Sequence, residues 1–452
     1  MLIALSLIKY FQESKVISEE ELIKAFRNNP DSLLNYIIEK KALKSTYRNI
    51  LVDFVLNSVS EDSRWEKYLW IALLPQRLSV VTVDNFCNLA CRMCGGSKGK
   101  MKWFKPGMLR KMLSHCPTAE MITFVAGNSE PMLNPDLREN FQILNENSIR
   151  STFVTNGHYL NRKNIDAMIE CQQPTSVNVS LDAIDPVIYK EIRGADNTKV
   201  LTGLFKLVEA KEKAGLELPH ISLLMVGMED NISELPKFVK LADQIGALRV
   251  HVDHMLGSYR PGDFTLNPEW RNHVVEAIEL AEKLDVLLQL PLDTMQIIQR
   301  EDLLKKKRFQ AEKEKCSDIK AKEKIQKQVK KPEFHDGASC GSKAVSLKEN
   351  IKEIAEMKTG HCPWLREAHI NIDGAIRPCC NMPANMGNIY EMPLWENQNF
   401  LQTRIHHSRG EIERLCMGNS NCTYVQELKE NNIRPRYIRK EKILEQIQMN
   451  EV

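Results

Sequence analysis

The sequence lacks any long hydrophobic run. Of its 452 residues 43% are hydrophobic, yet no stretch approaches the roughly 20 apolar residues that a membrane-spanning helix needs. The apolar start, residues 1–8, stops at Lys9 and has neither the basic segment nor the cleavage site of a signal peptide. The net charge is only +3, which provides no general attraction for nucleic acid. We therefore expect a cytoplasmic protein that binds neither membrane nor nucleic acid.

Cysteine, by contrast, is plentiful, and 12 cysteines without an export signal indicate metal binding in a reducing compartment rather than disulfide bonds. The most informative group is Cys87, Cys91 and Cys94, spaced C-x3-C-x2-C directly after the β-type run 78–83. Thiolates bind soft metals, and three of them leave one iron of a [4Fe–4S] cluster without a protein ligand. Zinc ligands or buried free thiols are the alternatives, although zinc sites usually show paired C-x2-C or Cys/His sets.

Residues 1–76 are expected to form a helical N-terminal cap. Ser18 followed by Glu21 predicts a capping box at the start of a helix. Apolar residues then recur with helical spacing through residues 33–38 and 50–55. A peptide-recognition module is the alternative, but such modules usually carry a β-hairpin, which the pattern does not indicate.

Residues 77–295 alternate short apolar strands with amphipathic helices, a pattern typical of parallel β/α repeats. The predicted fold class is α/β: a partial parallel (β/α) barrel with a helical N-terminal segment and a C-terminal metal-binding domain. Barrels of this kind carry their functional residues at the carboxyl ends of the strands. The strands are expected at residues 78–83, 121–125, 152–154, 176–181, 220–226, 248–253 and 286–290.

Residues 296–358 are expected to be a charged insertion or linker. Within residues 300–331, thirteen Lys or Arg stand against six acids, and apolar anchors are few. This composition favours a solvated helix or a mobile insertion. A binding patch for phosphate or an acidic partner is the alternative.

The cysteine motif after a strand resembles the hallmark of the radical SAM enzymes, in which S-adenosylmethionine chelates the open iron of a [4Fe–4S] cluster. Three further segments follow in the family's order. Residues 126–131 contain Glu130-Pro131 and are similar to the Gly-Gly-Glu-Pro segment, and Thr155-Asn156-Gly157 is similar to the Thr-Asn-Gly segment. Residues 179–183, followed by Ile192-Arg193-Gly194, resemble the segments beside the ribose and carboxylate of the cofactor.

The resemblance implies that S-adenosylmethionine is bound by Met93, Gly127, Glu130, Asn156, Ser180 and Arg193. Met93 stands where the family usually has an aromatic residue against adenine, and Asn128 and Ser129 replace usual glycines. Read without the resemblance, residues 126–131 are a turn after a strand, and Asp182 and Arg193 are a surface ion pair.

A second group of cysteines begins at Cys362. An apparent hairpin with Asp373-Gly374 at its turn leads to Cys379 and Cys380, and Cys416 and Cys422 follow. Residues 359–430 resemble the C-terminal extension called SPASM, or its shorter form called twitch. This resemblance implies one auxiliary [4Fe–4S] cluster held by Cys362, Cys379, Cys416 and Cys422, with Cys380 spare. A structural zinc site is the alternative, and residues 431–452 are expected to be a helical tail.

The resemblance further implies an enzyme that reductively cleaves S-adenosylmethionine and abstracts a hydrogen from a C–H bond. It would need an electron donor of the flavodoxin or ferredoxin type. The expected substrate is a small molecule such as a sugar or an aminocyclitol, which would be oxidised or epimerised. A maturase that modifies a ribosomal peptide or a protein side chain is one alternative. A non-catalytic iron–sulfur electron carrier is another.

His251 and Asp253, near the end of the sixth predicted strand, are candidate catalytic residues for substrate contact or proton transfer. Alternation along a strand places both on one face and His254 on the other. A structural role is the alternative for either histidine.

Overall fold

The computed structural model describes residues 18–39, 45–58, 61–94, 98–125, 129–255, 262–291, 294–295, 297–298, 367–377, 385–408, 411–412 and 436–437. The expected insertion at 296–358 and the expected tail at 431–452 therefore lie almost wholly outside the described residues. No helix within these ranges is long and apolar enough to cross a membrane.

The part of the chain before residue 77 is helical where it is described, with α2 Glu19–Asn28, α3 Pro30–Glu39, α4 Ser45–Ser58, the 3-10 helix η1 Ser63–Tyr68 and α5 Trp70–Leu73. The predicted capping box is confirmed, because Glu21 N donates to Ser18 Oγ at 3.3 Å and Ser18 N donates to Glu21 Oε2 at 3.1 Å. The helices pack around buried aromatic rings, among them Phe54 and Trp65, whose centroids lie 4.9 Å apart edge to face. This packing is continuous with the core of the sheet.

Nine strands form one sheet in the order β11-β10-β1-β4-β5-β6-β7-β8-β9, and every neighbouring pair is parallel except β10 and β11. The seven strands predicted from the sequence are present, with ends shifted by a few residues: β1 Arg77–Val81, β4 Met121–Val125, β5 Arg150–Thr155, β6 Ser176–Ser180, β7 His220–Gly227, β8 Arg249–His254 and β9 Leu287–Gln289. The described strands make an open sheet with edges at β9 and β11, not a closed barrel.

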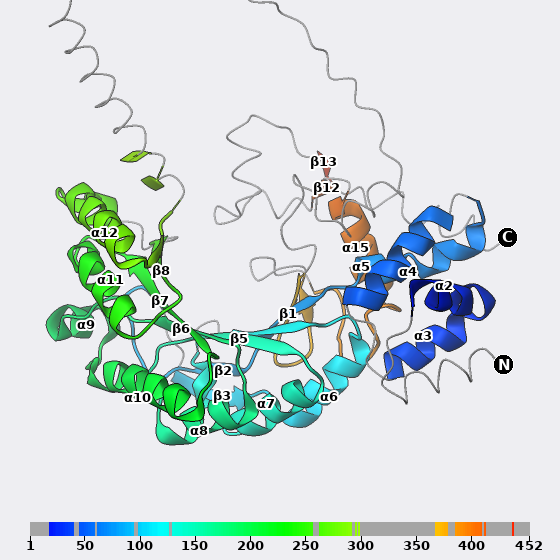
Figure 1. The fold of residues 1–452 in the computed structure, drawn as a ribbon, viewed down its shortest axis with the longest axis horizontal. Coiled ribbons are helices and arrows are strands. Elements are labelled where there is room, and N and C mark those ends of the chain that lie inside the picture. Colours follow the sequence, from blue (N-terminus) through cyan, green and yellow to red (C-terminus); the bar gives the residue numbers. More distant parts are fainter. Residues whose placement is uncertain are drawn as a thin grey trace, which may run out of the picture.

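Helices line one face of this curved sheet (Figure 1). Side chains that point toward them, such as Phe124 of β4 and Val179 of β6, are fully buried, whereas their neighbours along each strand are only partly buried. The helices between the strands are α6 Pro106–His115, α7 Leu137–Glu146, α8 Arg162–Cys171, α9 Pro186–Arg193, α10 Thr198–Ala214, α11 Leu235–Gln244 and α12 Trp270–Leu284, with 3-10 turns η2 Pro131–Leu133, η3 Ile232–Glu234 and η5 Phe264–Leu266. The carboxyl ends of the parallel strands consequently share one edge, where the functional loops lie.

The sequence does not predict the antiparallel hairpin of β2 Val83–Phe86 and β3 Lys98–Trp103. The run expected as one strand at 78–83 is divided at Thr82, whose N–H donates to Val125 O and whose carbonyl accepts from Phe104 N. The exposed lysines Lys98, Lys100 and Lys102 give β3 no apolar alternation that a sequence pattern could detect. This hairpin matters for function because it carries residues 87–94 between its strands.

The hairpin predicted around Asp373-Gly374 is present as β10 Glu367–Ile370 and β11 Ile376–Arg377. Gly374 has a φ of +87°, and a Cβ there would collide with Asn388 and Tyr390, so the turn requires glycine. β10 pairs in parallel with β1 and thus extends the main sheet. Beyond it lie α15 Gln398–Ser408 and the short strands β12 Glu411–Ile412 and β13 Arg436–Tyr437. Arg404 of α15 donates to Leu73 O at 2.5 Å and to Glu367 O at 3.2 Å, which connects α5 to β10.

His369 of β10 makes stability depend on pH. It is buried beside Arg377 of β11, and burial together with that charge lowers the pKa of His369 to about 4. In an unfolded chain a histidine titrates near 6.5. The unfolded state takes up the proton first, so stability should be lost as pH falls from about 6.5 toward 4, by up to about 3 kcal/mol.

Denaturant midpoints across this pH range should vary less in His369→Gln than in the wild type. His220→Gln, at the exposed start of β7, is the matched control and should keep the wild-type profile. An unchanged profile in His369→Gln would exclude this imidazole as the titrating group.

Candidate functional site

The C-x3-C-x2-C cysteines lie between β2 and β3, and Cys87, Cys91 and Cys94 are half-buried and form no disulfide. Lys98 Nζ holds the start of this loop by donating to Cys87 O at 2.7 Å and to Leu89 O at 2.9 Å. Burial raises the pKa of Cys87 and of Cys91. A negative charge on a neighbouring thiol would raise the pKa of each further. The thiols therefore share one neighbourhood in which a bound cation would favour their ionised form.

The second half of the loop packs on the end of α9. Arg92 N donates to Ile192 O at 2.8 Å, and a Cβ on Gly194 would lie 3.2 Å from Ala90 O. The Arg92 side chain forms an ion pair with Asp230 at 2.6 Å, beyond the end of β7. The loop is thereby fastened to two β/α connections at the carboxyl edge of the sheet.

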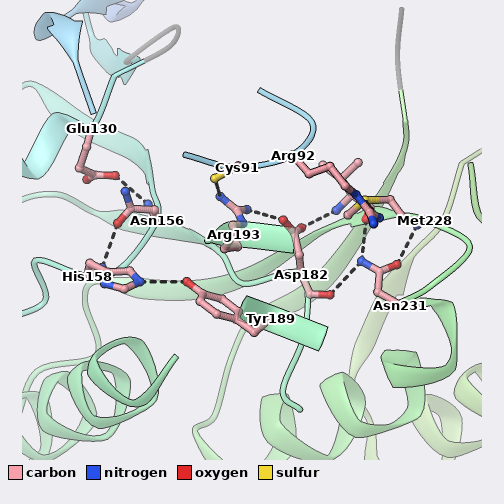
Figure 2. A network of polar contacts seen from close by, with 11 residues as sticks. Cys91, Arg92, Glu130, Asn156, His158, Asp182, Tyr189, Arg193, Met228 and Asn231 are labelled. Carbon is pink, nitrogen blue, oxygen red and sulfur yellow. Dashed lines mark hydrogen bonds and ion pairs between the residues drawn. The ribbon is translucent and has the colours of Figure 1, made fainter. Parts of the chain in front are cut away.

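Arg193, at the end of α9, lies between Asp182 and Cys91 (Figure 2). Its Nη2 is 2.6 Å from Asp182 Oδ2, and its Nη1 donates to Cys91 Sγ at 3.6 Å. The exposed fractions of the two paired side chains are 9% and 0%, so the interpretation of Asp182 and Arg193 as a surface pair is wrong. Burial raises the pKa of Asp182, and the Arg193 guanidinium opposes that rise.

Glu130 is completely enclosed and collects hydrogen bonds from two neighbouring segments. Its Oε1 accepts from Met132 N at 3.0 Å and from Thr155 Oγ1 at 2.6 Å, and its Oε2 accepts from Asn156 N at 2.8 Å. Burial raises the pKa of Glu130, and these hydrogen bonds oppose the rise. The carboxylate thus joins the turn after β4 to the end of β5.

Asn156 extends this arrangement to the cysteine loop. Its Nδ2 donates to Asn88 Oδ1 at 2.9 Å and approaches Cys87 Sγ at 3.9 Å. Gly157 follows with a φ of +77°, and any Cβ there would collide with Val200, which fits the role expected of glycine in this segment. On the other side His158 Nε2 lies 3.1 Å from the hydroxyl of Tyr189 in α9 (Figure 2).

The structure connects the remaining expected cofactor residues less closely to the site. Met93 is partly buried and packs on a small apolar group of Ile192, Met228 and Met255. Ser180 ends β6 with a half-buried side chain. Gly127 lies outside the described residues, as do Cys362, Cys379, Cys416 and Cys422, so their roles stay predictions.

His251 and Asp253 share one face of β8, as predicted, and His251 Nε2 lies 3.0 Å from Asp253 Oδ1. This hydrogen bond raises the pKa of His251. His254 points to the other face, where its Nδ1 lies 2.9 Å from Asp263 Oδ2 and its ring stacks on Phe264. His254 is therefore held by structural contacts, whereas His251 and Asp253 remain candidates for contact with substrate.

Sequence reasoning did not assign three residues that shape the site: Arg92, Asp182 and Asn231. Arg92 lies inside the cysteine motif, between Cys91 and Cys94, and this position could have indicated that it is part of the site. Asp182 adopts a φ of +61°, a conformation that Asp tolerates better than most residues. Asn231 donates to Asp182 O at 2.9 Å, a contact between separate loops that one sequence does not reveal.

Residues 81–242 match the family model of the radical SAM superfamily. Among curated proteins the chain is similar to the probable GTP 3′,8-cyclase of Methanococcus maripaludis, with 25% identity over 212 residues, 45% of this chain and 65% of the relative. The corresponding protein of Methanococcus aeolicus is 28% identical over 185 residues, 39% of this chain and 58% of the relative. The chain thus spans less than two thirds of the length of either relative.

Among solved structures, SuiB of Streptococcus suis aligns over 85% of this chain and 82% of its own, with a TM-score of 0.52 and 15% identity. SuiB bound to S-adenosylmethionine aligns over 82% of this chain and 77% of its own, with a TM-score of 0.51 and 13% identity. At this level of identity the likeness shows a shared fold.

The superfamily implies a [4Fe–4S] cluster and S-adenosylmethionine, and the donor set fits them. Three thiols lie on one loop, and N–H groups of Asn156 and Arg193 face two of the sulfurs. Within the described ranges no three His, Cys, Asp or Glu side chains are already gathered as for a metal ion.

Proposed function

We propose that this chain is a radical SAM enzyme that reductively cleaves S-adenosylmethionine and removes a hydrogen atom from a C–H bond of its substrate. The observation that carries the proposal is the convergence of four segments: the β2–β3 loop, the turn after β4, the end of β5 and the end of α9. Figure 2 shows Glu130 turned toward Asn156 and Arg193 turned toward Cys91. Asn156 also donates to Asn88 of the cysteine loop. When bound there, S-adenosylmethionine and the iron–sulfur cluster would supply a 5′-deoxyadenosyl radical.

The described residues suggest how this chain would hold the cofactor. Glu130 Oε2 accepts one hydrogen bond from the described residues, which leaves acceptor capacity for an ammonium group such as that of methionine. Because the carboxylate is enclosed, its side chain would have to turn outward to reach that group. Arg193 carries the charge that suits the carboxylate end, and Met93, Gly127 and Ser180 would complete the set. His251 and Asp253 would contact the substrate or move a proton, with His251 favoured in its protonated form by the hydrogen bond to Asp253.

Anaerobic incubation of iron-loaded protein with dithionite and S-adenosylmethionine tests the proposal, because only an enzyme of this kind yields 5′-deoxyadenosine. Absence of 5′-deoxyadenosine from protein with reducible iron would favour the alternative of a non-catalytic electron carrier. The expected cytoplasmic location stays a prediction.

The electron would come from a carrier of the flavodoxin or ferredoxin type. Lys98, Lys100 and Lys102 are exposed on the hairpin strand that follows the cysteines, and they suit an acidic protein surface. If such a carrier docks there, added salt should slow reduction by the carrier but leave reduction by dithionite unchanged.

The substrate is proposed to be a small molecule. The two sequence relatives described above are named for an enzyme that acts on GTP, not for one that acts on a sugar or an aminocyclitol. The peptide alternative is supported by the fold shared with SuiB, which has been solved with its precursor peptide SuiA, at a TM-score of 0.51 and 14% identity. Incubating the enzyme with GTP and, separately, with candidate peptides would distinguish the two by which one stimulates 5′-deoxyadenosine formation.

We further propose an auxiliary [4Fe–4S] cluster of SPASM or twitch type held by Cys362, Cys379, Cys416 and Cys422. The described hairpin with Gly374 at its turn supports this, because Cys379 is the second residue after the end of β11 in the sequence. Four thiolates would saturate the cluster, so its role would be electron transfer or stability. Reconstituted protein should contain about eight irons, from two clusters of this ligation.

The Cys380→Ala variant should keep that iron content, whereas Cys379→Ala should lose or damage one cluster. About twelve irons would indicate a second auxiliary site. Loss of iron in Cys380→Ala, with Cys379→Ala unaffected, would show that Cys380 is the ligand.

A further inference from the structure

Arg193 holds a buried positive charge against a cysteine of the C-x3-C-x2-C motif. Its side chain is 9% exposed, and its two terminal nitrogens reach Asp182 Oδ2 at 2.6 Å and Cys91 Sγ at 3.6 Å. Its Nε is buried without a hydrogen-bond partner in the described part of the chain. The guanidinium is therefore oriented by a carboxylate on one side and a thiol on the other.

Asp182 is itself fixed from the adjoining strand. Its Oδ1 accepts from Val226 N of β7 at 2.8 Å, and its backbone carbonyl accepts from Asn231 Nδ2 at 2.9 Å. Asn231 Oδ1 in turn accepts from Met228 N at 2.7 Å. These contacts hold Asp182 in its left-handed conformation, which persists where surrounding structure imposes it. Figure 2 shows Asn231 between Asp182 and Met228.

The cysteine loop is held from the other side at the same place. Arg92 N donates to Ile192 O, and Gly194 has a φ of +70° that lets the α9 terminus approach Ala90 O. Cys91 lies between these two contacts along the chain. The position of its sulfur relative to Arg193 is consequently set by backbone contacts as well as by the side chain.

We propose that the Asp182–Arg193 pair is a positioning device that fixes Cys91 and sets the reduction potential of the iron–sulfur cluster which this cysteine would hold. The inference rests on the proposed function, because it assumes that Cys91 is a ligand. Hydrogen bonds and charge at ligand sulfurs tune the potential of such clusters. A cation donating to Cys91 Sγ stabilises the more negative, reduced form, and the weakly screened interior strengthens this effect. Asp182 counters part of that charge and orients the guanidinium.

This role is separable from the expected role of Arg193 at the cofactor carboxylate. Binding of the carboxylate requires S-adenosylmethionine, whereas tuning through Cys91 operates without it. The reduction potential measured in the absence of S-adenosylmethionine therefore reports on the proposed role alone.

The test is an anaerobic redox titration of the iron-loaded full chain, followed by electron paramagnetic resonance. The signal that disappears in the variant lacking Cys87, Cys91 and Cys94 identifies the relevant cluster. Arg193→Met should lower the ratio of reduced to oxidised cluster at least tenfold at a fixed potential, which corresponds to about 59 mV for a one-electron couple. Asp182→Asn should shift the ratio the opposite way, and Arg193→Lys should recover part of the loss.

Arg138→Met is the matched control, because Arg138 forms an exposed ion pair with Glu170 on the outer helices. It should leave the potential unchanged. If Arg193→Met does not bind iron, the reduction potential of Asp182→Asn, which keeps the shape of the side chain, tests the proposal. Potentials equal to the wild type in Asp182→Asn, or in an iron-loaded Arg193→Met, would overturn the proposal. A wild-type chain with a reducible cluster but no 5′-deoxyadenosine would instead refute the proposed function.

Discussion

Replacing Cys87, Cys91 and Cys94 together by alanine should abolish 5′-deoxyadenosine formation and leave iron bound at the C-terminal site. The three thiols lie on one loop that is fastened by Lys98 on one side and by Arg92 on the other, so no other described cysteine can take their place. Without thiolates the iron that would chelate S-adenosylmethionine has no anchor in this part of the chain. The measurement is 5′-deoxyadenosine by chromatography, together with iron content per chain.

Cys116→Ala is the matched control for loss of a cysteine. Cys116 is buried at the end of α6, where burial raises the pKa of its thiol to about 12 and keeps it un-ionised. That variant should retain activity after correction for folded protein. If the triple variant still cleaved S-adenosylmethionine, the interpretation of the whole site would be wrong.

The second large effect is expected from Glu130→Ala, as a loss of folding stability. The change leaves the N–H groups of Met132 and Asn156 and the hydroxyl of Thr155 without their acceptor in a fully buried site. Each unsatisfied buried donor costs about 1–3 kcal/mol, and coupled losses do not simply add. We expect a fall of about 3–5 kcal/mol in the free energy of unfolding, a large share of a typical stability of about 5–15 kcal/mol.

Urea denaturation followed by circular dichroism would measure this loss. Glu139→Ala, on the exposed side of α7, is the control and should change stability by less than about 0.5 kcal/mol. Glu130→Gln should fall between the two, because its amide retains one acceptor oxygen. A loss below about 1 kcal/mol in Glu130→Ala would mean that water replaces the carboxylate and that the site is not closed.

Much of the fold follows from local sequence patterns. Each of the seven predicted strands is a run of apolar residues bounded by turn residues. The run and its boundaries lie within a few residues of one another in the sequence. The β2–β3 hairpin gave no such signal, because its lysine-rich second strand buries no apolar face. The pairing of β10 with β1 was also not predicted, since it depends on contacts between residues far apart in the chain.

Some residues of the candidate site were predicted from the sequence, but the residues that they contact were not. Glu130, Asn156 and Arg193 were found through short segments in a fixed order, and the structure brings all three toward the cysteine loop. Their contacts were not predictable, because Asp182, Asn231 and Arg92 bind residues of other β/α connections that are distant in the sequence. Asp182 and Arg193 proved not to be a surface ion pair because both side chains are buried. Their burial depends on the assembled sheet, so neither segment of the sequence reveals it.

The parallel pairing of β1 with β10 has a consequence for synthesis of the chain. Ser79 of β1 donates a hydrogen bond to Glu367 of β10, although the two residues are 288 positions apart. At about 5–20 residues per second, a ribosome needs roughly 15 to 60 seconds to make the intervening segment. During that time one side of β1 has no strand partner, and unpaired strand edges are templates for association between chains. A nascent chain of this protein should therefore be most dependent on chaperones in the interval between emergence of β1 and emergence of β10.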